Sequence, residues 1–307
     1  MTRIAVMLPG QGSQVVGMGR EMADAVPELR KLYEMADEVL GMPLSRVCWE
    51  GPEEELTATQ NAQPALLLHS YAVWTQLPES VRSGVVIGAG HSLGEFSAHL
   101  IAGTFGLEDA LRLVRARGEL MAGAGDERPG TMAAILGLEP AGVEEALSRV
   151  SSGSVVAANF NAPGQIVISG DIEAVAEAGR QATDLGARKV VQLNVSAAFH
   201  SPLMQGAEPG LAEALDGATW SDAAFPVVAN ATAEAVRAAG SAREALLRQL
   251  TSPVRWVEGV ERMRDAEPDL WLELGPGRVL AGLLKRIDRE QTAVSVGDLD
   301  AIAALAA

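Results

Sequence analysis

Cysteine and long apolar runs are both scarce in this sequence. Its single cysteine, Cys48, cannot form a disulfide within the chain, and no C-x-x-C pair or histidine cluster indicates zinc. The first apolar run, Ile4 to Leu8, is too short for the core of a signal peptide, and no stretch approaches the roughly 20 apolar residues that cross a bilayer. We therefore expect a soluble, cytoplasmic protein in which Cys48 is a buried apolar residue.

Positive charge is also in short supply. The chain has 24 Lys and Arg against 40 Asp and Glu, which gives a formal net charge of −16. This balance repels phosphate backbones and argues against nucleic acid as a partner, so any anionic ligand must be met by a few local cations. Apolar residues make up 48% of the 307 residues, which excludes a disordered chain and leaves ample core for one large or two moderate domains.

One stretch in the first third of the chain has the pattern of a catalytic turn. Val85 to Ile87 is suited to a buried strand, residues 90–94 read G-x-S-x-G, and helical composition resumes at Glu95. This order is that of a nucleophile elbow, in which the glycines leave room for a tight bend that presents Ser92. The first helical turn also offers unpaired N–H groups for a developing oxyanion. The alternative is a glycine-rich connection with an idle serine.

The N-terminal loop offers a second group for the same chemistry. Arg3 to Leu8 reads as a buried strand and residues 9–14 as the loop that leaves it. Val15 stands where the third glycine of G-x-G-x-x-G would fall, and no G-K-[ST] follows, so nucleotide binding is disfavoured. We expect the loop to bring the backbone N–H of Gln11 beside the elbow as an oxyanion donor.

Periodicity predicts helices over 27–40, 65–77 and 107–121, and Pro64 is expected in the first turn of the second helix. Residues 123–130 are rich in glycine and read as a break. Beyond them we expect a strand, helix, two strands, helix and strand, at 131–138, 140–150, 155–160, 165–169, 172–185 and 189–195, with a turn at 161–164. After residue 196, helices are expected around 203–215, 242–250 and 254–263, and strands at 226–229 and 270–274.

These elements predict an α/β protein made of two parts. The order βαββαβ is typical of a small ferredoxin-like α+β subdomain, which we place at residues 127–196. We place a large, hydrolase-like α/β catalytic domain with a mostly parallel sheet at residues 1–126 and 197–307.

A serine nucleophile needs a base, and the chain has four histidines. His91 adjoins Ser92 and is expected to point to the opposite side, and His99 lies about 10 Å along the same helix at 1.5 Å per residue. His69 sits among leucines and reads as an interior residue. His200 follows the last strand of the inserted unit at the seam between domains, where reactive groups gather, so it is the favoured base. The alternative is a surface-loop histidine.

Seven motifs spread over nearly the whole chain resemble, in order, those of malonyl-CoA:acyl carrier protein transacylases. They are Pro9-Gly10-Gln11-Gly12-Ser13, Gln63-Pro64-Ala65, Gly90-His91-Ser92-Leu93-Gly94-Glu95, Arg115-Ala116-Arg117-Gly118, Asn161-Ala162-Pro163-Gly164-Gln165, Phe199-His200-Ser201 and Glu273-Leu274-Gly275-Pro276-Gly277.

The resemblance implies a ping-pong transfer of malonyl from coenzyme A to the phosphopantetheine thiol of an acyl carrier protein, in fatty-acid or polyketide synthesis, with no cofactor or metal. Ser92 would be the nucleophile and His200 the base. By the same resemblance, the backbone N–H groups of Gln11 and Leu93 would form the oxyanion hole. The backbone carbonyl of Gln249 would orient the histidine, and Asn161 would lie near the pantetheine path.

Arg117 and Phe199 concern the choice of acyl group. A malonyl carboxylate needs a fixed cation, and a guanidinium provides two parallel donors for it. From the residues alone, the favoured interpretation of Arg117 is one of three arginines on a solvated helix face; the resemblance implies the carboxylate clamp. The resemblance also implies that Phe199 crowds a branch at the α-carbon. Rejecting one methyl is worth only about 1–3 kcal/mol, so some transfer of methylmalonyl is expected.

Two other classes of function compete with this prediction. A serine hydrolase or thioesterase would use the same elbow and base but release the acyl group to water, and a non-catalytic binding module would keep the pocket without turnover. Docking of an acidic carrier protein on a chain of charge −16 would need a local basic patch. Arg180, Arg188 and Lys189 are the candidates for it.

Overall fold

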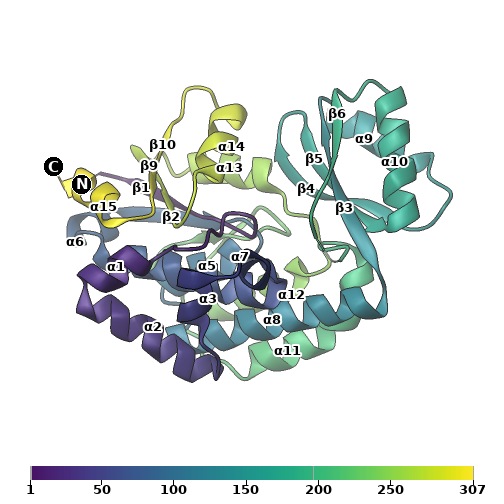
Figure 1. The fold of residues 1–307 in the computed structure, drawn as a ribbon. Helices are drawn as coiled ribbons and strands as arrows, with labels where there is room; N and C mark the ends of the chain where they lie inside the picture. The colour runs from purple at the N-terminus through teal and green to yellow at the C-terminus, as the bar shows by residue number, and fades with distance from the viewer. Residues whose placement is uncertain (1, 196, 307) are drawn as a thin grey trace.

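The computed structural model describes residues 2–195 and 197–306, and these form two sheets with helices packed against each (Figure 1). One sheet is mostly parallel and the other is antiparallel, so the chain has a mixed α/β fold. Among the helices of the described residues, none is both long enough and apolar enough to cross a membrane.

The larger sheet has the strand order β10-β9-β1-β2-β7-β8. All neighbours in it are parallel except β7 and β8. Its strands are β1 (Ile4–Leu8), β2 (Val85–Gly90), β7 (Val227–Val228), β8 (Ala235–Val236), β9 (Leu270–Leu274) and β10 (Ala293–Val296). Strands β8 and β10 were not predicted, because each is short and, among the described residues, has a strand partner on one side only. Since parallel strands end at the same edge, the loops that follow β1, β2 and β7 meet there.

Helices cover both faces of this sheet, and alternate residues of β1 show how. Ala5 and Met7 pack with Trp256 of the helix before β9 and with Leu284 of the helix after it. Ile4, Val6 and Leu8 pack on the other face, in the core formed with the long helices before and after β2. We call this sheet and its helices the parallel region. Its helices are α1 (Arg20–Ala25), α2 (Pro27–Leu40), α3 (Leu44–Glu50), α4 (Glu53–Thr57), α5 (Thr59–Gln76), α6 (Glu79–Arg82), α7 (Leu93–Ile101), α8 (Leu107–Glu127), η1 (Pro202–Ala207), α11 (Glu208–Asp216), α12 (Ala239–Gln249), α13 (Trp256–Arg264), α14 (Val279–Ile287) and α15 (Leu299–Ala306).

Helix α5 corrects the prediction for Pro64. Its expected start near residue 65 is wrong, because the helix already begins at Thr59 and Pro64 lies inside it. A proline inside a helix leaves the carbonyl four residues earlier without its N–H donor. Here Arg115 of α8 donates from Nη1 to the Gln60 carbonyl at 3.2 Å. A side chain distant in sequence therefore replaces the missing bond.

Helix α8 also runs further than predicted. The glycine-rich break expected at 123–130 is wrong for most of its length, since the helix continues through Gly123 and Gly125 to Glu127. Each interior glycine costs a helix up to about 1 kcal/mol. Contacts with η1 and α11 offset this cost, and the approach is close: a Cβ on Gly210 would lie 2.6 Å from a methyl of Leu120.

The second sheet has the strand order β4-β5-β3-β6 and is antiparallel throughout. Along the chain its elements are β3 (Gly130–Leu136), α9 (Pro140–Ser148), β4 (Val155–Ala162), β5 (Gln165–Asp171), α10 (Ile172–Asp184) and β6 (Lys189–Gln192). We call these elements the antiparallel unit. The expected turn at 161–164 is shorter than predicted, because β4 continues to Ala162, which pairs with Gln165, and Gly164 alone takes a positive φ, of 65°.

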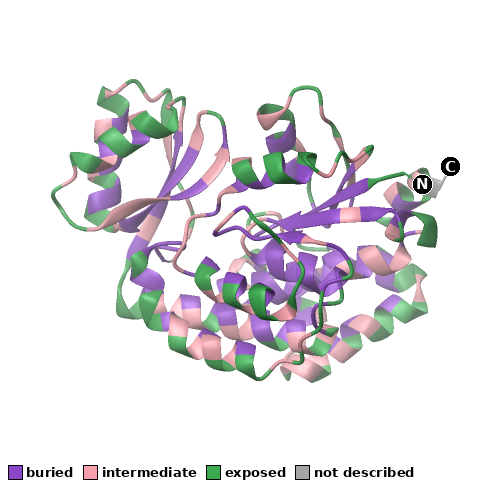
Figure 2. Cartoon of the chain, turned by 180° about the vertical axis from the view of Figure 1, so that it is seen from behind, coloured by how far each residue is buried: buried purple, intermediate pink, exposed green. Residues whose placement is uncertain are grey.

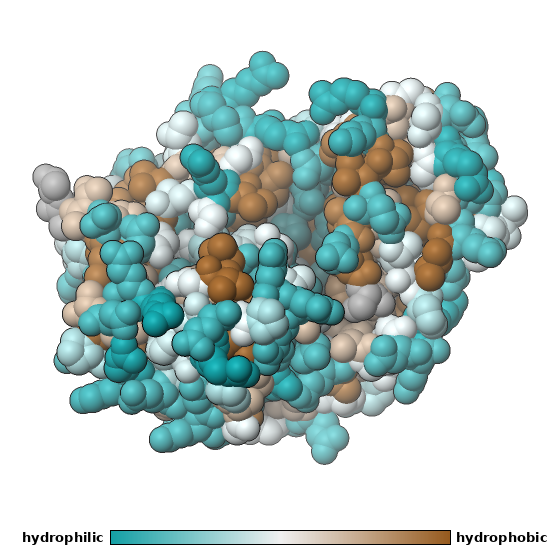
Figure 3. Space-filling model, in the orientation of Figure 1, coloured by the Kyte–Doolittle hydropathy of each residue, from teal (hydrophilic) through white to brown (hydrophobic). Residues whose placement is uncertain are grey.

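The antiparallel unit has a core of its own between the sheet and helices α9 and α10, which includes Ile135, Val143 and Val175. It joins the parallel region through backbone bonds. Phe160 N–H donates to the Val254 carbonyl at 2.9 Å, and Val254 N–H donates to the Ala158 carbonyl at 2.8 Å. Figure 2 shows the buried strands of both sheets and the exposed outer faces of the helices. Polar side chains cover most of the surface drawn in Figure 3.

Candidate active site

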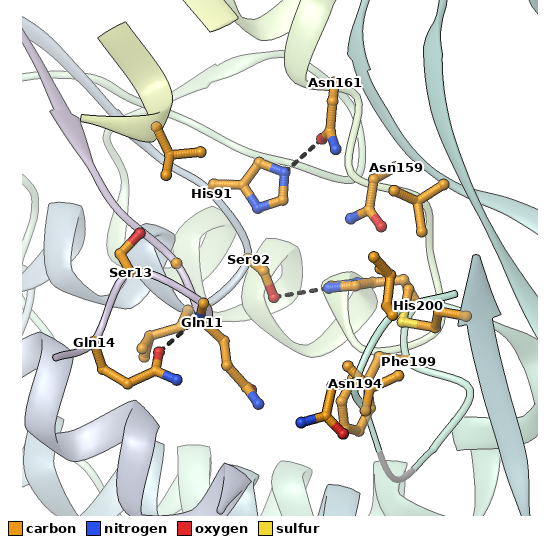
Figure 4. A pocket seen from close by; sticks show the side chains of 18 of the residues that line it. Gln11, Ser13, Gln14, His91, Ser92, Asn159, Asn161, Asn194, Phe199 and His200 are labelled. Atoms are coloured by element: carbon orange, nitrogen blue, oxygen red, sulfur yellow. Dashed lines mark hydrogen bonds between the residues drawn. The ribbon is translucent and has the colours of Figure 1, made fainter. Parts of the chain in front are cut away.

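A pocket of about 540 Å³ lies where the parallel region meets the antiparallel unit. Loops after β1 and β2 form one side of it, and strands β4 and β5 form another (Figure 4). Seven of the predicted site residues line it, and they are Gln11, Ser92, Leu93, Arg117, Asn161, Phe199 and His200. Gln249, the eighth, is fully buried and bonds to three of them.

Ser92 sits on a strained turn between β2 and α7. Its φ of 51° and ψ of −108° are unusual for a residue with a side chain. The turn is possible because of its glycines: a Cβ on Gly90 would lie 1.8 Å from the Gly94 carbonyl carbon, and a Cβ on Gly94 would lie 2.1 Å from the Leu8 carbonyl oxygen. The Ser92 N–H donates to Oδ1 of Asn230, which lies just after β7, at 2.7 Å. This hydrogen bond holds the turn in place. Strain of this kind is typical of functional sites.

His200 faces this serine directly. Its Nε2 lies 2.7 Å from Ser92 Oγ, and its Nδ1 lies 3.0 Å from the Gln249 carbonyl oxygen (Figure 4 shows the first contact). A carbonyl can only accept, so Nδ1 carries the proton and Nε2 is left as the acceptor for the serine hydroxyl. This is the tautomer that a general base needs. In the described residues a backbone carbonyl thus stands where a carboxylate would complete a triad.

The environment keeps His200 neutral. Burial, and after it the positive charge of Arg117, lower the pKa of His200 to about 3. A neutral imidazole at neutral pH can accept the serine proton. Its φ of 55° is also in the left-handed region, so both partners of this hydrogen bond occupy strained backbone.

Arg117 is not on a solvated helix face, since its side chain is 1% exposed. Its Nη1 donates to Gln63 Oε1 at 2.8 Å, and its Nη2 donates to Gln249 Oε1 at 2.9 Å and to Ser92 Oγ at 3.0 Å. The guanidinium stacks over the Phe96 ring, with 5.4 Å between Arg117 Cζ and the ring centroid. Burial lowers the pKa of Arg117 to about 10, so the group stays charged at neutral pH.

The two predicted oxyanion donors lie on adjoining loops. Leu93 is the first residue of α7, so its N–H has no partner within the helix's own i to i−4 pattern. Gln11 follows β1, and its side chain donates to Thr59 Oγ1 at 3.2 Å. Both residues line the pocket with Ser92. The N-terminus of α7 adds a partial positive charge at the same place.

Phe199 and Asn161 lie on the other side of the pocket. Phe199 precedes His200 and is 5% exposed, so most of the ring is packed in the core. Asn161 of β4 holds His91, whose Nε2 lies 2.7 Å from Asn161 Oδ1. His91 therefore bonds to Asn161 and not to the serine hydroxyl. The other two histidines are buried with different partners, His69 beside the Gly297 carbonyl at 3.0 Å and His99 beside Thr104 Oγ1 at 3.0 Å.

Three polar residues that the sequence reasoning did not select hold the site in place. Gln63 lies just before the predicted start of a helix, but it is fully buried and binds Arg117. Asn230 donates to the Gly90 carbonyl at 2.8 Å and accepts from Ser92 N–H, and it follows a predicted strand, which was a usable signal. Glu95 is fully buried below the elbow. Within residues 2–195 and 197–306, no group of three or more His, Cys, Asp or Glu side chains gathers as a metal site would.

The serine turn, the histidine tautomer and the buried guanidinium fit an enzyme that transfers acyl groups, and comparison with known proteins agrees. The acyl transferase domain family matches residues 6–301. The chain is 42% identical to the malonyl CoA-acyl carrier protein transacylase of Bacillus subtilis, over 98% of this chain and 96% of that one. It is 41% identical to the Escherichia coli protein of the same name, over 99% of each chain.

Solved structures give the same result. A malonyl-transacylase in complex with a type II polyketide synthase acyl carrier protein superposes with a TM-score of 0.94 at 41% identity, covering 98% of both chains. The acyl-carrier-protein S-malonyltransferase of Bartonella henselae has a TM-score of 0.94 at 40% identity, covering 99% of this chain and 98% of that one. The chain belongs to the malonyl-CoA:acyl carrier protein transacylase family.

Proposed function

We propose that this chain transfers malonyl groups from malonyl-CoA to the phosphopantetheine thiol of an acyl carrier protein. The names of its relatives support this activity. The observation that carries the proposal is the position of Arg117: a charged, buried guanidinium lies 3.0 Å from the serine oxygen. Within the described residues its hydrogen-bond acceptors are uncharged, so its charge remains available to a carboxylate on the acyl group.

In the first half of the reaction, His200 Nε2 takes the proton of Ser92 as Oγ bonds to the thioester carbon. The carbonyl oxygen becomes an oxyanion that accepts hydrogen bonds from Gln11 N–H and Leu93 N–H. The tetrahedral intermediate then collapses, the carbon–sulfur bond breaks, and the thiolate of coenzyme A takes the proton from His200. The product is a malonyl ester on Ser92.

The second half of the reaction reverses these steps with a different thiol. The carrier's phosphopantetheine thiol gives its proton to His200 and attacks the ester carbon, and Ser92 leaves with that proton. The Gln249 carbonyl keeps the imidazole in the required tautomer through both halves. Arg117 holds the malonyl carboxylate, Phe199 limits branching at the α-carbon, and Asn161 lies along the pantetheine.

The proposal also covers the division of the chain into two domains. We propose a hydrolase-like catalytic domain at residues 1–126 and 197–307, and a ferredoxin-like subdomain at 127–196. The observed order βαββαβ and the sheet order β4-β5-β3-β6 support the second assignment, although Ser196 lies outside the described residues.

We assign the enzyme to the cytoplasm. Its carrier would dock near Arg180, Arg188 and Lys189, which are all exposed on the antiparallel unit.

One experiment separates transfer from hydrolysis and from simple binding. The purified chain is mixed with labelled malonyl-CoA, with and without a phosphopantetheinylated carrier protein. A transferase keeps the label on the protein until carrier is added and then passes it to the carrier. Rapid release of free malonate without carrier would indicate a hydrolase, and failure to trap any adduct would indicate a binding module.

A further inference from the structure

Glu95 is a buried carboxylate behind the site that the reaction above does not use. It lies in the first turn of α7 and is 0% exposed. Its Oε2 accepts from Asn230 N–H at 3.0 Å and from Gln249 Nε2 at 2.7 Å. Its Oε1 is also buried and has no hydrogen-bond partner among the described residues. Burial of a carboxylate oxygen without a hydrogen-bond partner destabilises the folded chain, which suggests that Glu95 has a functional role.

The side-chain amide of Gln249 lies between Glu95 and Arg117. Its Nε2 donates to Glu95 and to the Ser92 carbonyl at 2.9 Å, while its Oε1 accepts from Arg117 Nη2 at 2.9 Å. A flipped amide would set oxygen against the carboxylate and NH₂ against the guanidinium, so only one orientation satisfies both neighbours. The amide therefore connects the two opposite charges and keeps them from direct contact.

We propose that Glu95 is a positioning residue that holds Arg117, through the Gln249 amide, ready for a carboxylate, and that its charge sets how strongly the site prefers malonyl to acetyl. This inference rests on the proposed function. A direct ion pair would satisfy the guanidinium and compete with substrate. Because the Gln249 amide lies between the two groups, the negative charge of Glu95 partly offsets the positive charge of Arg117. Both Nη groups of Arg117 nevertheless remain directed at neutral oxygens.

The arrangement has a consequence for charge. A malonyl carboxylate on Arg117 brings a second anion close to Glu95, so Glu95 opposes the acyl group that Arg117 attracts. Removal of its charge, by substitution or by protonation, should strengthen malonyl binding and leave acetyl binding almost unchanged.

Protonation of Glu95 is within the accessible pH range. Burial raises the pKa of Glu95 to about 7, against the opposing effects of its hydrogen bonds and of Arg117. The charged group that acts on it is Arg117 of α8. Along the chain the nearest histidines are His91 in the turn and His99 one turn further along α7, and His200 hydrogen-bonds Ser92. The pKa of each histidine is lowered by burial, and Arg117 stays charged, so Glu95 is the group among these that titrates near pH 7.

The test measures binding without turnover, in a Ser92→Ala background, by calorimetry with malonyl-CoA and acetyl-CoA. Glu95→Gln keeps an acceptor for Asn230 and Gln249 but has no charge. We expect it to raise the ratio of malonyl to acetyl affinity about five- to tenfold. With Glu95 intact, the same ratio should rise as the pH falls from 8 to 6, and the Gln variant should lose this dependence. The pH series needs no substitution at residue 95, so it still applies if that variant folds poorly.

A matched control is Glu273, a second fully buried carboxylate, which accepts from the N–H groups of Leu280 and Ala281 at the start of α14. Glu273→Gln should leave the affinity ratio unchanged. Equal weakening of both ligands by Glu95→Gln, or a ratio that does not depend on pH, would overturn the inference. Malonyl loading of the chain with Ser92 intact is measured in parallel. Its absence would instead refute the proposed function.

Discussion

The parallel region and the antiparallel unit differ in what they contribute to the pocket. The parallel region supplies the serine, the histidine, the guanidinium and the loops with the oxyanion donors, and all four histidines of the chain lie in it. The antiparallel unit supplies neutral side chains such as Asn159, Asn161 and Val167. The comparison indicates that reacting groups are fixed on the edge of the parallel sheet, while the separate unit shapes the opposite wall.

Packing explains why the division is possible. The antiparallel unit has its own core, so its strands can form a wall without residues from the parallel sheet. Ser92, in contrast, is held by residues from three places in the chain, namely Asn230 after β7, Gln249 at the end of α12 and Arg117 in α8. Substitutions in the two parts should therefore differ in size of effect, and the predictions below test this difference.

The largest effect is expected for His200→Ala in the parallel region. Loss of the base should lower the rate of Ser92 acylation by about 10²- to 10⁴-fold, the usual contribution of a general base. Single-turnover acylation with labelled malonyl-CoA measures it. A loss smaller than about tenfold would show that another group takes the proton, and would remove His200 from the mechanism.

Acid should destabilise the parallel region selectively. Burial lowers the pKa of His69 to about 4 and the pKa values of His99 and His200 to about 3. The folded state then binds fewer protons than the unfolded state below pH 6.5, so stability falls as the pH falls, by roughly 2 kcal/mol per histidine between pH 7 and 5. The raised pKa of Glu95 acts in the opposite sense and offsets about one histidine.

The net loss that these four groups contribute between pH 7 and 5 is thus about 3–4 kcal/mol in the free energy of unfolding. Urea unfolding at the two pH values measures it. Hydrogen exchange then locates the change, which should lie in α5, α7 and the loop before η1. Equal loss of protection in β3 to β6, which carry no histidine, would contradict the division between the two parts.

Arg117→Ala should change the choice of acyl group more than it changes the chemistry. Malonyl transfer should fall about 10- to 100-fold, because the carboxylate would be left unpaired in a buried place. Acetyl transfer should improve, since the pocket would no longer hold an unpaired cation. The ratio of kcat/KM for the two acyl-CoA substrates is the readout, and equal losses for both would exclude Arg117 as the carboxylate clamp.

The smallest effect is expected in the antiparallel unit. Asn161→Ala removes an amide from the pocket wall and the partner of His91, and should raise KM for malonyl-CoA several-fold with little change in kcat. Steady-state kinetics with both CoA and carrier substrates measure the change. A fall in kcat comparable with that of His200→Ala would mean that the antiparallel unit takes part in the chemistry.

Much of this architecture could be predicted from local patterns. Strand β9 and helix α2 were predicted with their observed bounds, because alternating or helical apolar spacing is complete within each segment. The turn at Ser92 was also predictable, since the G-x-S-x-G pattern stands between a strand pattern and a helix pattern in one short segment. His200 could be chosen because the chain has only three other histidines, each with a reason for exclusion.

The remainder depended on contacts between distant segments. Helix α5 could not be extended past Pro64 from sequence, because the bond that repairs it comes from Arg115 in another helix. The strand expected at 189–195 ends earlier, at Gln192, where pairing with β3 stops. Gln63 has ordinary local surroundings, and only the fold reveals that it contacts Arg117. Asn230 follows a predicted strand, but its hydrogen bond to Ser92 joins segments that are distant in sequence.

The most direct test of the central claim is the intact mass of the protein after brief mixing with malonyl-CoA in the absence of carrier, followed by peptide mapping. The account predicts one added malonyl group, located on Ser92, that disappears when a phosphopantetheinylated carrier is added and that never forms on Ser92→Ala. A malonyl group found on any other residue, or its persistence on the Ser92→Ala chain, would contradict the account.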